Sequence, residues 1–519
     1  MNRYRLVAAA FALLALYYFT IPANHTETED AFDFAYRVRT ASFAELIYPH
    51  HLVYLPAAKL LYSTGLFRDA FKMMLGIDLL LGVAAVVLVY FLARLRLDLS
   101  ARAALFAAAF LAFSYGYWRY SVAAEVYIPA IFMQALLCYA VFAKENTRAR
   151  DFLCGGLGAL AIATHGPVSA PLAVAAIPVY LALSRRFRSL FIYGAVATTA
   201  VIAAYYFGHR LHAPDEGTLR NFIAFVKGPP EEIRAFSAAT LAKAALGFGA
   251  SFVSSNVVFA LAPVAARLQA LMPYRNLTEE LFMAKAFSPW VAGLSVICGS
   301  ALGLLGIYIL TQLRVRLGDL QRFVREPKAV ALLVWIVVYI VLVTIINPDS
   351  PELWICLLLP LALTTGLLLD RFFKDKILRL PLVFCALLFV QNLCGMAMIH
   401  SPASDYNAHK ATWLLSEARS GDAIFTRDAD VFTRYLRYHV GAGVAVTNCW
   451  ANDAAATEQL VNAARENAAR IFLFTDVFEP PLYLRSKHGD IVEGLAALQA
   501  TMREKLQPTA DPSVWLLEP

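Results

Sequence analysis

The sequence predicts a polytopic α-helical membrane protein of about 11 transmembrane helices with a small extracytoplasmic C-terminal α/β domain. Of its 519 residues, 60% are hydrophobic and only 16% are charged, which is far from the composition of a soluble enzyme. Apolar runs of about 20 residues, the length that crosses a bilayer, recur through the first 400 positions. Beyond them, short apolar runs alternate with helical patterns, which is typical of an α/β domain.

Eleven apolar runs are predicted to cross the membrane. They are residues 5–22, 71–93, 103–116, 122–143, 152–164, 167–183, 189–207, 289–312, 329–346, 353–370 and 379–397. The first follows Arg3 and Arg5, as a signal peptide would, but it lacks a convincing small-residue cleavage site and is predicted to be a retained anchor. A twelfth run, 244–262, is less hydrophobic and rich in Gly, Ser and Asn, so hydropathy leaves its crossing open.

Basic loops predict the orientation of these helices. The loops rich in Lys and Arg are 94–102, 144–150, 185–188, 314–328 and 371–379. In the opposing short loops, 115–121 and 164–167, the only Lys or Arg residue is Arg119. All the basic loops are cytoplasmic only if 244–262 does not cross completely. Residues 208–288 then form one long outer loop with a re-entrant or interfacial segment, and the C-terminal tail lies outside.

Two domains are expected, a transmembrane catalytic domain at 1–400, with a first outer loop at 23–70, and an α/β domain at 401–519. Strands are predicted at "DAIFT" (422–426), "VAVT" (444–447) and "RIFLFT" (470–475). The tail has no glycine-rich nucleotide-binding motif and no identifiable catalytic group. Six of seven cysteines lie in apolar spans, which predicts no disulfide framework. The net charge of +7 is explained by the cytoplasmic loops and does not indicate nucleic-acid binding.

The first outer loop begins with four carboxylates in "TETEDAFD" (26–33). Thr26 and Glu29 have the spacing of a capping box, and Asp33 lies four residues before Arg37, the spacing of a helical ion pair. Asp30 has no cation nearby in the sequence and lies one helical turn from Asp33. Two such carboxylates favour protonation of each other, which suits a general base. The alternative is that these acids are solvated residues at the start of a helix, without a catalytic role.

Further polar residues are predicted at the same membrane face. They are His50, His51 and Tyr54 in "YPHHLVYLP" (48–56), Arg119, Glu125 and Tyr127 in "WRYSVAAEVY" (118–127), and His165 in "ATHGP" (163–167). Each has an ordinary explanation, because Glu125 can pair with Arg119 and the histidines can cap turns or pack. Ionisable groups at a membrane boundary are costly, however, so their convergence on one face predicts a functional site.

These motifs resemble those of the GT-C superfamily of integral membrane glycosyltransferases, which implies a GT-C-like transmembrane domain. The nearest likeness is to the branch related to protein O-mannosyltransferases, which uses polyprenyl-phosphate-linked sugars. The resemblance rests on the acidic pair, "PHHLVYLP", "AEVY" at the head of the fourth span and the histidine after the fifth, and it covers roughly residues 5–185 by motif. "HHLVY" stands where proline and glycine usually follow the first histidine, which leaves the role of His51 and the acceptor class open.

The resemblance implies transfer of a sugar from a polyprenyl-phosphate donor to a glycan, lipid or protein acceptor, with inversion at the anomeric carbon. By position, Asp30 resembles the catalytic base and Asp33 its companion. The residues that the resemblance assigns to substrate binding are His50, His51, Tyr54, Arg119, Glu125, Tyr127 and His165. Alanine-rich spans favour a bacterial plasma membrane, with the site on the extracytoplasmic side.

Two other functions stay open at the level of sequence. A secondary transporter or lipid flippase would use acids and histidines as a relay near the bilayer midplane. A structural assembly subunit would use the tail to recruit partners. Clustering at one face favours the transferase. No metal site with clear ligand spacing is visible, although His50, His51 and Asp30 leave a divalent cation open.

Overall fold

The computed structural model contains two compact units. The residues that it describes are 3–25, 30–145, 147–215, 218–228, 235–271, 277–314, 321, 323–372, 379–487 and 489–517. The helical unit comprises residues up to 21, 41–255 and 290–396, and the α/β unit comprises 22–40, 256–289 and 397–519.

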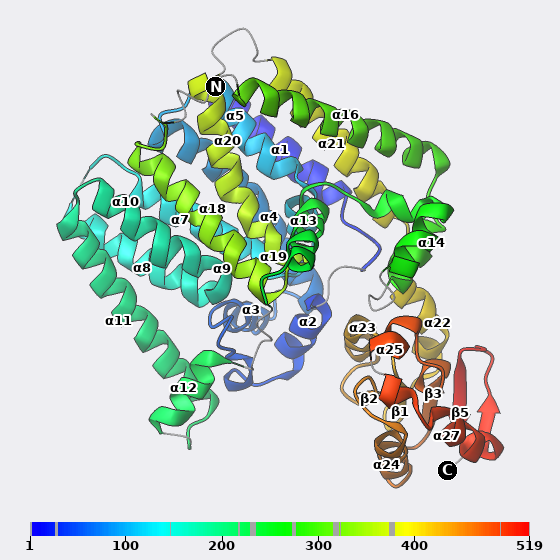
Figure 1. The fold of residues 1–519 in the computed structure, drawn as a ribbon. Helices are drawn as coiled ribbons and strands as arrows, with labels where there is room; N and C mark the ends of the chain where they lie inside the picture. The colour runs from blue at the N-terminus through cyan, green and yellow to red at the C-terminus, as the bar shows by residue number, and fades with distance from the viewer. Residues whose placement is uncertain are drawn as a thin grey trace. The chain divides into compact units, whose positions relative to one another are not determined.

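The helical unit is built from helices alone in its described residues. Its elements are α1 (Arg3–Phe19), η1 (Ala44–Leu46), α3 (Tyr54–Tyr62), α4 (Ala70–Phe91), η2 (Leu92–Arg96), α5 (Ala101–Phe113), α6 (Tyr115–Ser121), α7 (Tyr127–Val141), α8 (Arg148–Thr164), α9 (Gly166–Ala170), η3 (Pro171–Ala176), α10 (Ile177–Leu183), α11 (Phe187–His212), α12 (Leu219–Lys227), α13 (Ala238–Phe252), α16 (Pro289–Arg314), α18 (Pro327–Ile346), α19 (Pro351–Trp354), η5 (Ile355–Leu357), α20 (Leu358–Phe372) and α21 (Arg379–Ile399). In Figure 1, α4 packs against α5 and α7, α20 against α5 and α18, and α8 against α7 and α11.

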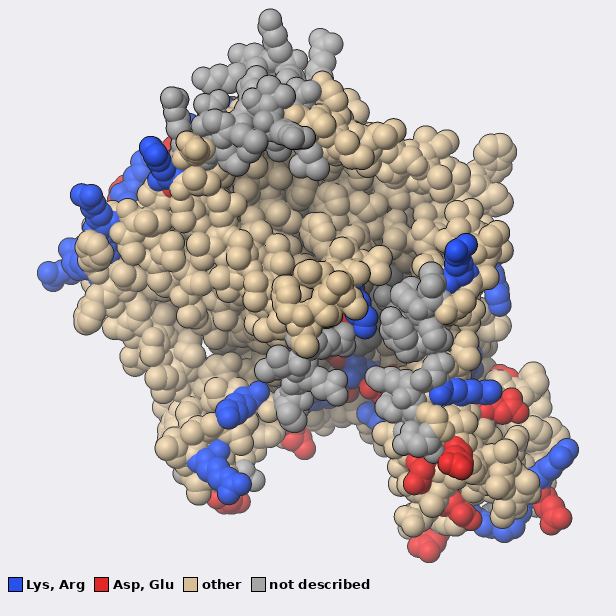
Figure 2. Space-filling view, in the orientation of Figure 1, with Lys and Arg blue, Asp and Glu red and all other residues tan. Residues whose placement is uncertain are grey.

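A helix lies at every predicted span. In the described residues, seven helical segments are long and apolar enough to cross a membrane, and α1, α5 and α7 are shorter apolar helices. Helix α8, of 17 residues, occupies the remaining predicted span. Helix α13 has 15 residues and overlaps the doubtful run only at 244–252, so it is too short to be among the seven. Figure 2 shows a broad uncharged area over the helical unit, whereas side chains of both charge signs are spread over the α/β unit.

The basic loops predicted to be cytoplasmic are joined to one another by hydrogen bonds. Four contacts link these loops or the residues that border them. They are the Lys328 ammonium with the Arg96 carbonyl, the Arg186 guanidinium with the Ala143 carbonyl at 3.2 Å, the Ser100 N–H with the Asp370 carboxylate at 3.0 Å, and the Lys144 ammonium with the Asp98 carboxylate at 3.1 Å. These loops therefore lie at one end of the helical unit, as the charge pattern predicts.

Cysteine labelling tests the predicted orientation. We expect Asp215→Cys in the long outer loop and Glu458→Cys in the tail to react with a membrane-impermeant maleimide from the extracytoplasmic side. Ala149→Cys, in a basic loop, should react only after the membrane is permeabilised. The background should be low, because all seven natural cysteines are buried. Reaction of Asp215→Cys and Glu458→Cys from opposite sides would overturn the 11-span topology.

The α/β unit is built around a mixed five-stranded sheet of order β2-β1-β3-β5-β4. Its elements are α2 (Ala31–Thr40), η4 (Asn256–Ala260), α14 (Ala262–Leu271), α15 (Thr278–Ala284), η6 (Pro402–Ser404), α22 (Tyr406–Glu417), β1 (Ala423–Thr426), α23 (Asp430–Val440), β2 (Ala445–Asn448), α24 (Ala454–Arg465), β3 (Ile471–Phe474), η7 (Thr475–Val477), α25 (Leu482–Lys487), α26 (Gly489–Val492), α27 (Leu495–Met502), η8 (Arg503–Lys505), β4 (Leu506–Pro508) and β5 (Val514–Leu517). β1 is parallel to β2 and β3, whereas β5 is antiparallel to β3 and β4.

All three predicted strands are confirmed, each within one residue at either end. Sequence reasoning missed β4 and β5. β4 has only three residues and ends in proline, which cannot donate to a sheet and is confined to edge positions. The α/β unit also includes residues 22–40 and 256–289, which the sequence assigned to the domain at 1–400. In this unit α2 packs against α23, and α15 packs against α22.

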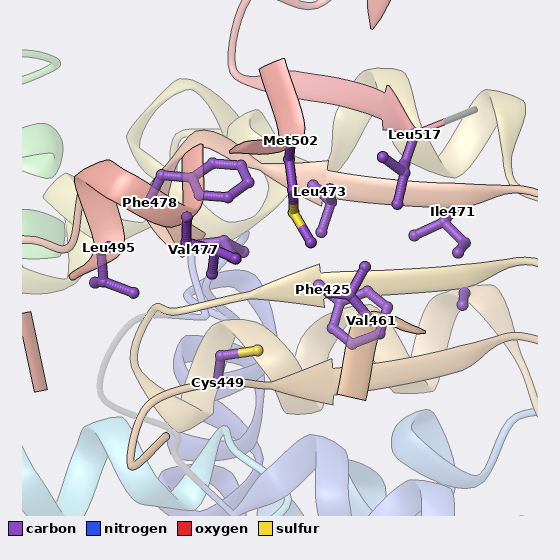
Figure 3. Close-up of a cluster of buried hydrophobic side chains, with 12 residues drawn as sticks. Phe425, Cys449, Val461, Ile471, Leu473, Val477, Phe478, Leu495, Met502 and Leu517 are labelled. Atoms are coloured by element: carbon purple, nitrogen blue, oxygen red, sulfur yellow. The ribbon is translucent and has the colours of Figure 1, made fainter. Parts of the chain in front are cut away.

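Helices cover both faces of the sheet. On one face, Phe425 and Leu473 pack with Val461 of α24 and Leu498 of α27 in a buried core, part of which Figure 3 shows. The opposite face packs against α22 and α23, where the Trp413 ring lies 6.0 Å from Phe472. Because strand side chains alternate in direction, neighbouring residues of β3 contribute to opposite layers.

Candidate functional site

The acidic pair lies in the α/β unit, at the start of α2. The Asp33 carboxylate lies 3.9 Å from the Arg37 guanidinium, which confirms the predicted helical ion pair. Asp30 directly precedes the helix, and its Oδ1 accepts a hydrogen bond of 2.5 Å from Arg434 of α23. Sequence reasoning missed this cation because 404 residues separate the two positions. Thr26 and Glu29, the expected capping box, lie outside the described residues.

The surroundings of Asp30 raise its pKa above the usual range of aspartate. Burial is the largest cause, Arg434 opposes it, and the neighbouring carboxylate of Asp33 adds to it. The Asp30 side chain is nevertheless 41% exposed, so a hydroxyl group can approach it. A carboxylate that is accessible and more basic than usual is suited to accept a proton.

The helical unit brings together three of the predicted histidine and tyrosine residues. The His51 and His165 rings meet edge to face with centroids 4.6 Å apart, and the Tyr127 ring lies 5.3 Å from His165. Their loops are held by backbone hydrogen bonds, since Gly166 N–H donates to the His50 carbonyl at 3.2 Å and Val53 N–H donates to the Ala163 carbonyl at 3.1 Å. The predicted convergence of the first outer loop with the turn after the fifth span is therefore present.

His165 is buried, with 4% of its surface exposed. Burial, followed by the neighbouring His51 and His50, lowers the pKa of His165, which makes the neutral imidazole its form at neutral pH. Its Nδ1 has no hydrogen-bond partner within the described part of the chain. A neutral imidazole can form hydrogen bonds with a hydroxyl group but does not supply positive charge to a phosphate.

Asp78 of α4 is a site residue that sequence reasoning missed. Its Oδ2 accepts a hydrogen bond of 2.7 Å from the Glu125 backbone N–H and one of 3.2 Å from the Tyr54 hydroxyl. Asp78 is fully buried and therefore fixes two of the predicted binding residues relative to each other. A sequence signal existed, because Asp78 is the only charged residue between Lys72 and Arg94, and an ionisable residue inside an apolar span is a functional candidate by default.

Arg119 and Glu125 lie near the junction of α6 and α7. Each is 1% exposed, so both charged side chains are buried in the helical unit. Tyr117 of α6 donates a hydrogen bond of 2.6 Å to the Gly82 carbonyl of α4, which holds α6 against the helix that contains Asp78. Buried charges need compensating partners, so these two residues belong to a specific polar arrangement and not to a solvated surface.

The end of the seventh predicted span and the long outer loop that follows it also reach this cluster. The Tyr205 hydroxyl of α11 donates a hydrogen bond of 2.8 Å to the Pro49 carbonyl. Gly228, at the end of α12, has a φ of +66°, and a Cβ atom there would lie 2.8 Å from His50 Nε2. Only glycine combines this backbone conformation with so close an approach. The sequence predicted the outer loop but not its contact with His50.

The predicted site residues thus fall into two groups. Asp30 and Asp33 lie in the α/β unit, and the seven predicted substrate-binding residues lie in the helical unit. Across the described ranges, no group of three or more His, Cys, Asp or Glu residues is arranged to hold a metal ion.

Comparison with known proteins identifies the fold. No family model and no curated protein matches the sequence. The crystal structure of ArnT from Cupriavidus metallidurans bound to undecaprenyl phosphate matches with a TM-score of 0.56 and 11% identity, covering 99% of this chain and 97% of that chain. The structure of the same ArnT in the apo state matches with a TM-score of 0.57 and 12% identity, covering 99% of this chain and 96% of that chain. An oligosaccharyltransferase from Archaeoglobus fulgidus matches with a TM-score of 0.48 and 14% identity, covering 93% of this chain and 66% of that chain. The chain therefore has an ArnT-like fold along nearly its whole length.

Proposed function

We propose that the protein is a membrane glycosyltransferase that moves a sugar from a polyprenyl-phosphate donor to a glycan, lipid or protein acceptor on the extracytoplasmic face. The main support is the fold shared along 99% of the chain with ArnT, one structure of which contains undecaprenyl phosphate. A bacterial plasma membrane is the proposed location. The buried polar cluster of the helical unit adds a site where ordinary membrane packing would place apolar residues.

The proposed reaction needs a base and little covalent chemistry from the enzyme. Asp30 accepts the proton of the acceptor hydroxyl while the oxygen of that hydroxyl forms a bond to the anomeric carbon. The bond between this carbon and the phosphate oxygen breaks, and polyprenyl phosphate leaves with the electron pair. Attack from the side opposite the phosphate inverts the anomeric configuration. Asp33, one turn away, is the companion that keeps Asp30 basic.

Donor binding is assigned to the helical unit. Arg119 is the proposed cation for the phosphate, because it is buried and an arginine fork matches phosphate geometry. His165, which is neutral and whose Nδ1 has no hydrogen-bond partner among the described residues, is proposed to bind a sugar hydroxyl. The residues proposed to shape the remainder of the donor pocket are His50, His51, Tyr54, Glu125 and Tyr127. Asp78 is a positioning residue that acts through Tyr54 and Glu125.

A change at Arg434 tests the role of Asp30 through pH. Arg434 lowers the pKa of Asp30 against the larger raising effect of burial, so Arg434→Gln should raise that pKa further. A general base works only when deprotonated, so transfer is lost as the pH falls through its pKa. We therefore expect the acidic limb of the rate profile to move to higher pH in Arg434→Gln and to stay in place in Arg419→Gln, an exposed control. An unchanged limb would argue against Asp30 as the base.

A transporter or lipid flippase remains the second candidate, and one observation favours it. Asp78 is buried within an apolar helix, as relay residues of transporters are.

The transferase is tested by incubating purified protein in lipid vesicles with radiolabelled polyprenyl-phosphate sugars and a membrane extract that supplies acceptors. Thin-layer analysis should show label leaving one donor lipid and appearing in a new product. Label that stays on every donor would contradict the proposal.

A further inference from the structure

The α/β unit has a cavity outside the carboxyl ends of β1 and β3. These strands are adjacent and parallel, but the chain leaves β1 towards β2 and leaves β3 towards β4 and β5. The sheet therefore has a topological switch point between them, which is where open α/β sheets bind ligands. Asp428 and Asp476, each the second residue after its strand, line the cavity.

The cavity has a volume of about 990 Å³, at the upper end of the range typical for small-molecule sites. One wall is a single face of α22, where residues at helical spacing line the cavity: Tyr406, His409, Lys410, Trp413 and Ser416. The opposite wall includes Glu479 and the turn at 510–513 before β5. Every lining residue belongs to the α/β unit.

A buried charge network forms the floor of this cavity. The Lys410 ammonium contacts Asp428 and Asp476 at 2.5 Å each, and the three side chains are 11%, 4% and 12% exposed. Burial lowers the pKa of Lys410, but the two carboxylates raise it by more, so Lys410 stays protonated. Its ammonium occupies the position between the carboxylates that a metal cation would need. Tyr406 donates to Asp428 at 3.0 Å and completes the network.

The charge of the cavity selects its ligand. Among the lining residues, four carboxylates, those of Asp428, Asp476, Glu479 and Asp511, stand against one cation, Lys410. Phosphates, nucleotides and acidic glycans would be repelled. The other groups are aromatic rings and hydroxyls, the latter from Thr412, Ser416, Thr475 and Ser513. Carboxylates accept strong hydrogen bonds from sugar hydroxyls, and the negative face of an aromatic ring attracts the polarised C–H groups of a sugar ring.

We propose that this cavity binds an oligosaccharide that is neutral or bears amino groups, with Trp413 as the stacking platform. The half-buried Trp413 ring is fixed by its contact with Phe472, so little conformational freedom is lost on binding. The proposal adds a glycan-binding site in the C-terminal unit, and it concerns binding alone, so it stands or falls independently of the transfer reaction.

A glycan array probed with the full-length protein in nanodiscs, without donor lipid, tests this site. We expect binding to some neutral or amino-substituted oligosaccharides and none to sulfated or sialylated ones. Trp413→Ala should lower the affinity about tenfold or more, since aromatic anchors dominate binding sites. Trp450→Ala is the matched control, because Trp450 is half-buried in the same unit and does not line the cavity, and its ring is tilted against that of Tyr483 with centroids 5.0 Å apart.

A second variant tests the cavity at a residue that does not pack against the sheet. Thr412 is an exposed residue of the cavity wall, so Thr412→Arg fills the cavity without disturbing the layer between α22 and β3. It should abolish glycan binding while the thermal unfolding midpoint stays at the wild-type value. The proposal is overturned if the wild type binds no oligosaccharide, if it binds only acidic ones, or if Thr412→Arg binds as well as the wild type.

Discussion

Asp30→Asn is expected to lower the rate of sugar transfer by a factor of about 10² to 10⁴, the usual cost of removing a general base. Asparagine keeps the size and one acceptor oxygen of aspartate but cannot take the acceptor proton. The ion pair that is lost joins two side chains that are 41% and 26% exposed, so its loss should cost under about 1 kcal/mol of stability. Expression, membrane insertion and donor-lipid binding should therefore be close to wild type.

Two neighbouring acids are the controls for this variant. Glu29→Gln should be mild, and Asp33→Asn should reduce the rate less than Asp30→Asn, because Asp33 already pairs with Arg37. Initial rates with a single radiolabelled donor, measured for all three variants, decide between them. An inactive Asp33→Asn beside an active Asp30→Asn would make Asp33 the base. Wild-type rates in all three would refute the proposed mechanism.

Asp78→Ala should strongly destabilise the helical unit. It removes the acceptor for the Glu125 N–H and the Tyr54 hydroxyl, and each buried donor left without a partner costs about 1–3 kcal/mol. Transfer should also fall, because Tyr54 and Glu125 lose the group that positions them. Asp78→Asn, which keeps an acceptor oxygen, should recover part of both losses.

The matched control is Asp98→Asn, at the basic end of the same unit, because asparagine tolerates the positive φ of this residue. Asp98 pairs with Lys144 at 3.1 Å, but the two side chains are 54% and 75% exposed, so the change should cost under about 1 kcal/mol. Thermal unfolding in detergent compares the two variants. Equal unfolding midpoints for Asp78→Ala and Asp98→Asn would show that the buried hydrogen bonds do not stabilise the unit.

Local patterns in the sequence predicted the features that depend on neighbouring residues. Hydropathy located a helix at each expected span, and alternation of short apolar runs located β1, β2 and β3. Charge asymmetry placed the basic loops at one end, where Lys328 and Arg96 meet. The sequence also placed His51 and His165 at the same membrane face, and in the structure their rings are in contact.

The features that the sequence did not reveal depend on contacts between distant segments. Arg434 reaches Asp30 only because α2 packs against α23, and no spacing rule spans such a separation. Asp78 was hidden by its own helix, since one carboxylate hardly changes the hydropathy of "GIDLLLGVAAVVLVYF". The cavity beside Lys410 arises from parallel pairing of β1 with β3, which brings Asp428 and Asp476 together although two strands and two helices separate them in the sequence.

Following the donor lipid itself tests the central claim most directly. Purified wild-type protein and Asp30→Asn are reconstituted in vesicles with a labelled polyprenyl-phosphate sugar and an acceptor extract, and mass spectrometry quantifies free polyprenyl phosphate and glycosylated product. We predict that the wild type releases one polyprenyl phosphate for each sugar transferred and that Asp30→Asn releases almost none. Intact donor lipid that merely moves between the two leaflets, at equal rates in both proteins, would contradict the transferase and favour a flippase.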